Sequence, residues 1–192
     1  MKRFSILLLL ILIPVFVMAQ QWTVGPRAGL NVARLTDFSE KWGCWGHAGV
    51  FGEWQKSDWA LEADLLYSAQ GAQYDDWRNT DHYLLIPLKA KYYIPACRGL
   101  NLFAGPQLDI CLKRNSINFD WAPDVIPPGE SNYKRSCMVS ATFGVGYRFR
   151  CGLDVAANYN ISLMSNLKKD FDPSRNSVFQ FSIGWCLFKI GK

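Results

Sequence analysis

Hydrophobic and polar residues alternate with a period of two along most of the chain. The clearest stretch covers residues 82–112, where apolar or aromatic residues fill the even positions from Leu84 to Ile94 and both Lys89 and Lys91 fall at odd ones. Successive side chains of a β-strand point to opposite faces, so this period predicts a strand with one apolar and one polar face. The alternation resumes at Leu100, which predicts a second strand folded back across a short turn.

The same pattern predicts six further strands, at residues 23–35, 43–55, 59–73, 134–149, 153–163 and 178–188. Each run lasts about ten residues or more, whereas strands of soluble proteins are typically about five or six residues long. A tilted strand of about 9–11 residues crosses a bilayer. Pro87 and Pro106 fall within two of the runs and predict bulges or gaps, because proline cannot donate to the ladder.

The connections between the predicted strands are alternately long and short. This asymmetry is typical of outer-membrane barrels, which have long extracellular loops and short periplasmic turns. We therefore predict an all-β fold, an eight-stranded antiparallel up-and-down transmembrane β-barrel with both termini in the periplasm. The alternative is a soluble eight-stranded lipocalin-like barrel, which would turn its polar side outward.

Composition and the N-terminal segment support an envelope location. Hydrophobic residues make up 49% of the chain and aromatic residues 15%, yet after the first segment no stretch is apolar enough for a membrane helix, as expected for alternating strands. Lys2-Arg3, an apolar run, and Val17 and Ala19 predict a signal peptide at residues 1–19. An N-terminal anchor is the alternative, but the run is shorter than about twenty residues. Residues 20–192 then form the barrel domain.

These observations indicate the partners of the protein. The formal net charge of +5 is too mild to favour a nucleic-acid partner. We expect the outer membrane of a Gram-negative-type cell, with outer-membrane lipid as the surroundings and with ligands or proteins contacted through the extracellular loops. The candidate contact residues lie in the longest connection, which is rich in aromatic residues and proline: Phe119, Trp121 and Tyr133.

Charged residues fall mainly on the predicted inward faces. The interior of an eight-stranded barrel is only wide enough for side chains, so these charges are expected to pair into a network that fills the lumen. A selective pore or proton path is the functional alternative. The predicted lumen network consists of Arg27, Glu53, Glu62, Asp64, Lys89, Lys91, Asp109, Arg148 and Asp154.

The remaining candidate chemistry is sparse. No Ser-His-carboxylate arrangement can be traced on one face, although His82 near the outer rim could serve a lipid-modifying enzyme as a base. Metal-ligand spacing is absent, so we expect no metal, no cofactor and no enzymatic activity. Among six cysteines, Cys97 and Cys151 both fall on predicted periplasmic turns and form the candidate disulfide.

Several short motifs resemble a known family, the small outer-membrane β-barrel domains of PorT-like proteins, which are related in architecture to OmpX and OmpA barrels. The resemblance covers the chain after the signal peptide. The motifs that carry it are Tyr83-Leu84-Leu85-Ile86-Pro87-Leu88-Lys89 with Tyr92-Tyr93, Phe103-Ala104-Gly105-Pro106-Gln107-Leu108, Gly144-Val145-Gly146-Tyr147, and Phe179-Gln180-Phe181-Ser182-Ile183-Gly184. They imply the fold and no catalytic residue.

Four functional hypotheses remain open. The first is a non-enzymatic envelope or surface interaction protein with a closed lumen. The resemblance to PorT-like proteins implies the second, a component of an outer-membrane protein secretion apparatus. The third is a narrow channel, and the fourth is a lipid-modifying barrel enzyme that uses His82.

Overall fold

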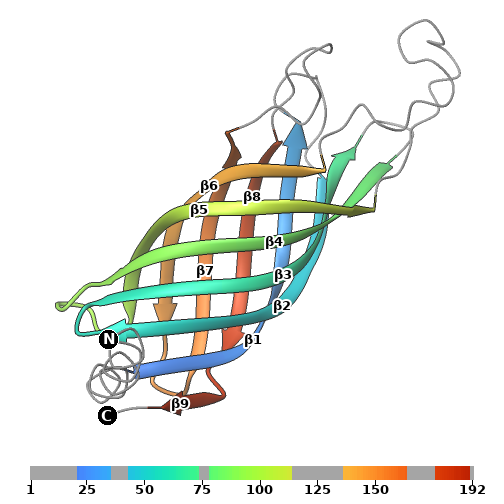
Figure 1. Cartoon of the computed structure of the whole chain (residues 1–192). Coiled ribbons are helices and arrows are strands. Elements are labelled where there is room, and N and C mark those ends of the chain that lie inside the picture. Colours follow the sequence, from blue (N-terminus) through green and yellow to red (C-terminus); the bar gives the residue numbers. More distant parts are fainter. Residues whose placement is uncertain (1–20, 36–42, 74–77, 114–135, 164–175, 191–192) are drawn as a thin grey trace, which may run out of the picture.

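The computed structural model describes residues 21–35, 43–73, 78–113, 136–163 and 176–190. These residues form one antiparallel β-sheet that curves into a barrel (Figure 1). Its strands are β1 (Gln21–Leu35), β2 (Gly43–Lys56), β3 (Trp59–Gln73), β4 (Arg78–Tyr93), β5 (Leu100–Lys113), β6 (Cys137–Arg148), β7 (Leu153–Ser162), β8 (Asn176–Trp185) and β9 (Phe188–Ile190).

The barrel is closed by its first strand. Each strand from β2 to β7 pairs with its successor in the chain, and β1 pairs with both β2 and β8. Closure leaves no unpaired edge among the long strands, as a sheet in lipid requires. The predicted fold class, an eight-stranded up-and-down barrel, is therefore confirmed.

Three short turns, after β2, β4 and β6, lie at one end of the barrel, which we call the short-turn end. The first residues of β1 and the short β9 lie at the same end (Figure 1). Gly99 and Gly152 in two of these turns have φ angles of 106° and 96°. Such left-handed backbone is readily adopted by glycine, which explains the glycine in these two turns; in the turn after β2, Ser57 has a positive φ of 56°.

The two faces of each strand have opposite chemistry. On β4, Leu88 is 55% exposed, whereas Lys89 and Lys91 are 6% and 2% exposed. Large apolar side chains cover the outside along the other strands as well, among them Phe143, Phe181 and Ile183. A soluble carrier would show the reverse arrangement, so the lipocalin-like alternative is wrong.

The two strand prolines interrupt the ladders without shifting them. Pairing between β3 and β4 is missing around Pro87, and pairing between β4 and β5 is missing around Pro106. The register is the same on both sides of each interruption, because Pro87 lies opposite Gln107 and Ala90 lies opposite Ala104. Of the predicted bulges or gaps, these are gaps, and the missing proline N–H accounts for them.

The last strand differs from the prediction of one continuous run at residues 178–188. Ile183 lies opposite Ala28 and Phe188 lies opposite Val24, so five steps along one strand match four along the other. The extra residue is a β-bulge, which separates β8 from β9. Leu187 and Phe188 are consequently both exposed, at 59% and 65%.

Candidate functional site: an ion-pair network in the lumen

Eight charged side chains from six strands meet inside the barrel near the short-turn end. The sequence pattern places each at an inward position, and the sheet brings them together only when it closes. We call this set the lumen network: Arg27 of β1, Glu53 of β2, Glu62 and Asp64 of β3, Lys89 and Lys91 of β4, Arg148 of β6 and Asp154 of β7.

Arg27 is the centre of the network. Its Nη1 atom lies 2.6 Å from Oε1 of Glu62 and 2.7 Å from Oδ2 of Asp64. Its Nη2 atom lies 2.9 Å from Oδ1 of Asp154. The guanidinium also packs 4.5 Å from the ring centre of Phe51. One side chain that is 2% exposed thus binds three carboxylates, which suits the planar fork of arginine.

The two lysines of β4 extend the network along β3. Lys89 Nζ lies 3.0 Å from Glu62 and 2.6 Å from Asp64. Lys91 Nζ donates to Glu53 over 3.0 Å and also contacts Oε2 of Glu62. Each lysine therefore bridges two carboxylates, and Glu62 is bound by Arg27 and by both lysines.

Glu53 is held by side chains of two other strands, β4 and β6. Arg148 contacts its Oε1 atom through Nη1 and donates to Oε2 through Nη2 over 3.0 Å. The Tyr93 hydroxyl donates to the same carboxylate over 3.0 and 3.1 Å. Arg148 also lies 2.9 Å from Asp154. Because β6 and β2 are not neighbours in the barrel, the Arg148–Glu53 pair crosses the lumen.

The charges of the lumen network balance, with four cations and four carboxylates. A buried ion costs several kcal/mol of desolvation unless a counter-ion and hydrogen bonds compensate it. Here every member has at least one partner of opposite charge. The arrangement fills the interior with paired side chains, and its direct chemical consequence is closure of the lumen.

Asp109 is the one predicted network residue that lies apart. Its carboxylate accepts hydrogen bonds from Gln107 Nε2 over 2.7 Å and from the Ser140 hydroxyl. Both partners are neutral and come from β5 and β6. Asp109 is the fifth residue from the long-connection end of its strand, too far along the barrel for the cations, and the prediction that it joins the network is wrong.

A neutral polar cluster occupies the lumen beyond the charges. His47 Nδ1 lies 2.7 Å from Asn31 Oδ1, and its Nε2 lies 2.9 Å from Ser182 Oγ. Sequence reasoning missed this Ser-His-Asn arrangement because it comes from β8, β2 and β1. The inward position of His47 was the available signal. Ser182 and His47 are 7% and 4% exposed, so a substrate has no direct path to the hydroxyl.

The other predicted residues lie outside this site. Cys97 and Cys151 are exposed on the short turns after β4 and β6, and no disulfide joins them in the structure. Their pairing stays a prediction. Phe119, Trp121 and Tyr133 lie outside the described residues. His82, on the outer face, accepts or donates a 2.8 Å hydrogen bond with the Tyr67 hydroxyl, and no serine–histidine pair forms there.

Aromatic side chains ring the outside of the barrel at the short-turn end. Trp22, Trp59 and Trp185 are 43%, 63% and 46% exposed. Trp59 packs against Tyr92, with ring centres 4.9 Å apart. Tyrosine and tryptophan gather in this way at membrane–water interfaces, where an apolar ring meets polar headgroups. Within the described ranges, no helix is long and apolar enough to cross a membrane.

The polar, ion-paired interior and the apolar exterior with an aromatic girdle define a transmembrane β-barrel of the outer-membrane class. Residues 18–168 match the family model described as "Outer membrane protein beta-barrel domain". The chain belongs to this family, and it is an outer-membrane protein. No curated protein sequence matches the chain.

Solved structures of similar fold include two bacterial surface proteins. The Neisserial surface protein A (NspA) has a TM-score of 0.51 at 12% identity, over 86% of this chain and 97% of that one. Ail, the attachment invasion locus protein of Yersinia pestis, in complex with the heparin analogue sucrose octasulfate, also has a TM-score of 0.51, at 10% identity over 90% and 100% of the two chains. At identities this low, the structural similarity shows the shared fold alone.

Proposed function

We propose that this protein is a non-enzymatic surface interaction protein whose lumen is closed and whose long connections make the contacts. In this proposal residues 1–19 are a signal peptide that directs export. The short-turn end and both termini face the periplasm, and the connections at residues 36–42, 74–77, 114–135 and 164–175 face the outside of the cell.

The observation that carries this proposal is the lumen network. Arg148 and Glu53 pair across the barrel, and Arg27 bridges three carboxylates at its centre. An ion moving through the barrel would have to separate several buried ion pairs. Separating such a pair is costly in free energy, because it leaves a buried charge without its partner. The network therefore argues against the channel hypothesis. It leaves the ends of the barrel as the surfaces that would contact ligands or proteins.

Planar lipid bilayer recording tests the closed lumen. The purified protein, inserted into the bilayer, is expected to pass no steady current at 100 mV. As a positive control, the double variant Glu53→Ala with Arg148→Ala should conduct, because it removes a pair that crosses the lumen. Regular unit steps of current from the unmodified protein would overturn the proposal in favour of a channel.

Contact through the long connections needs a separate measurement. Ail provides a first probe, because it is solved with a heparin analogue, so the protein in liposomes can be passed over immobilised heparin. We expect retention, and we expect it to fall when Phe119, Trp121 and Tyr133 are all replaced by alanine. Retention that is unchanged in this variant would remove these residues from the proposal, and no retention would exclude sulfated sugars as the ligand.

A role in a protein secretion apparatus is the second candidate. It is supported by the motifs that resemble PorT-like proteins, among them the Gly144-Val145-Gly146-Tyr147 stretch of β6. Chemical crosslinking in intact envelopes, followed by purification of the protein, separates the two candidates. A stable complex with other envelope proteins of a secretion system supports this role, whereas an uncrosslinked barrel contradicts it.

A further inference from the structure

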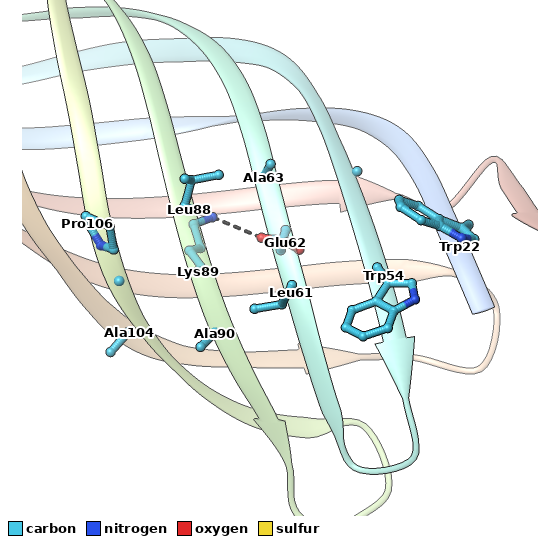
Figure 2. A pocket seen from close by; sticks show the side chains of 12 residues that line it. Trp22, Trp54, Leu61, Glu62, Ala63, Leu88, Lys89, Ala90, Ala104 and Pro106 are labelled. Carbon is cyan, nitrogen blue, oxygen red and sulfur yellow. Dashed lines mark hydrogen bonds and ion pairs between the residues drawn. The ribbon is translucent and has the colours of Figure 1, made fainter. Parts of the chain in front are cut away.

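An open groove runs across the outer surface of β2, β3, β4 and β5 close to the short-turn end. Its volume is about 720 Å³, within the range of roughly 300–1,000 Å³ that is usual for ligand sites. Figure 2 shows Trp22 and Trp54 on one side of the groove and Ala104 and Pro106 on the other. The groove thus lies on the face that the fold turns towards lipid.

Small residues create the hollow. Ala63, Ala90 and Ala104 occupy outward positions on three successive strands and line the groove. Many outward positions outside the groove carry large side chains instead, such as Phe143 and Phe181, which are 50% and 53% exposed. The groove is therefore a local depression in an otherwise bulky apolar surface, and its shape suits a flexible hydrocarbon chain.

The side chains around the depression are apolar as well. Leu61 and Leu88 line it and are 56% and 55% exposed. Glu62 and Lys89 also belong to the lining residues, but their charged groups pair with each other inside the barrel. The side chains that project outward into the groove consequently present an apolar surface. This surface is complementary to the apolar part of an amphiphilic ligand.

A cation, Lys56, lies beyond the lining of the groove, on the short-turn side of Trp54. Lys56 is the last residue of β2 and is two positions beyond Trp54, so both residues belong to the outward face of the strand. Lys56 is exposed and forms no ion pair with any residue that the structure describes. An apolar groove with an exposed ammonium two residues beyond its edge is complementary to an acyl chain that carries an anionic headgroup.

The short-turn end carries further positive charges besides that of Lys56. Exposed cations at the short-turn end are Arg98, Arg150 and Lys189 besides Lys56. Asp58, in the same turn as Lys56, is the half-buried carboxylate near the groove, while Glu53 and Asp154 are buried in the lumen network. Basic residues next to an apolar membrane surface attract anionic lipid headgroups.

We propose that this groove is a binding site for one anionic glycerophospholipid of the leaflet at the short-turn end. An acyl chain lies over Ala63, Ala90 and Ala104, Trp22 and Trp54 flank the glycerol region, and Lys56 binds the headgroup phosphate. The inference rests on the proposed placement of the short-turn end in the periplasm, because that leaflet would supply the phospholipid.

Native mass spectrometry of the whole protein, released from detergent micelles that contain a stated lipid, tests the site. We expect one bound dioleoylphosphatidylglycerol per barrel, with occupancy about fivefold above that of dioleoylphosphatidylethanolamine. Lys56→Gln should remove this preference, and Lys113→Gln, an equally exposed change at the opposite end of the barrel, should preserve it. Equal occupancy by the two lipids, or a preference for lipid A, would overturn the proposal.

Filling the groove tests the acyl-chain half of the site. Ala90→Leu should lower the occupancy of both phospholipids severalfold, and Ala63→Leu gives a second variant if the first does not fold. Ala48→Leu is the matched control, since Ala48 also points outward on β2 but lies away from the groove. Occupancy that stays unchanged in the folded groove variants contradicts the assignment.

A separate readout distinguishes failure of the site from failure of the proposed function. Each preparation is run on a gel with and without boiling, because a folded outer-membrane barrel migrates differently from the unfolded chain. A protein that shows the shift but retains no phosphatidylglycerol refutes the lipid site alone. An unmodified protein without the shift refutes the membrane barrel itself.

Discussion

Arg27 on β1 and Asp154 on β7 form an ion pair of 2.9 Å, although their strands are not neighbours in the sheet. The pair therefore joins two non-adjacent strands through the lumen. Arg148 on β6 and Glu53 on β2 do the same. These contacts exist only in the closed barrel, so they couple closure of the sheet to neutralisation of its buried charges.

Removal of the central cation should destabilise the barrel strongly. Arg27→Met leaves Glu62, Asp64 and Asp154 with one partner fewer, and breaking a buried ion pair from one side costs about 3–5 kcal/mol. Arg150→Met, an exposed change, should stay within about 0.5 kcal/mol. Urea unfolding in phosphatidylcholine vesicles, followed by tryptophan fluorescence, measures both. Equal free energies of unfolding for the two variants would show that the network contributes little.

A charge on the outer wall should be costly as well. Phe143 lies near the middle of β6 and is 50% exposed. Phe143→Arg is expected to lower the free energy of unfolding by about 2–4 kcal/mol, the cost of arginine at the membrane midplane of a barrel. Phe143→Leu is the control and should cost less. The same vesicle assay applies. An unchanged free energy of unfolding in Phe143→Arg would mean that this face meets water.

Close approach of two strands makes Gly105 sensitive to a single methyl group. A Cβ at this position would lie 1.8 Å from the backbone oxygen of Leu88, whereas a Cβ at Gly52 would meet nothing within 4 Å. Gly105→Ala should therefore destabilise by about 1–3 kcal/mol, as overpacking does, and Gly52→Ala should not. Thermal unfolding on unboiled gels compares the two, and indistinguishable midpoints would contradict the strand spacing described here.

Two exposed cysteines report the orientation in the membrane. Cys97 and Cys151 lie on short turns, which the proposed function places in the periplasm. After mild reduction, a membrane-impermeant maleimide should label them only once the outer membrane has been permeabilised. The same cells provide a test of the predicted disulfide, because labelling of permeabilised cells should then require the reductant. Labelling of both thiols in intact cells would invert the orientation.

The alternation of residues was enough to predict the fold, since a period of two fixes both the strands and their faces. β3 has the predicted bounds, Trp59–Gln73, because apolar residues recur at every second position from Trp59 to Ala69, although Leu66 interrupts the polar face. The bulge at Cys186 and Leu187 was not predictable in this way. It arises from the pairing of β8 and β9 with β1, which depends on residues more than a hundred positions away.

The partners within the site were harder to predict than its members. In the sequence, Asp109 and Asp154 look alike, as inward carboxylates on alternating strands. Asp154 reaches Arg27 and Arg148, whereas Asp109 meets only Gln107 and Ser140. The two carboxylates differ in their position along the barrel axis. This position is set by strand tilt and stagger, and hydrophobic periodicity does not reveal it.

Nitroxide labels placed one at a time on β8 test most directly which face of each strand meets lipid. In vesicles, labels at Phe181 and Ile183, which are 53% and 61% exposed, should be accessible to oxygen dissolved in the bilayer and shielded from a water-soluble nickel complex. A label at Ser182 should be shielded from both. High nickel accessibility at Phe181 and Ile183, with oxygen accessibility at Ser182, would contradict the account.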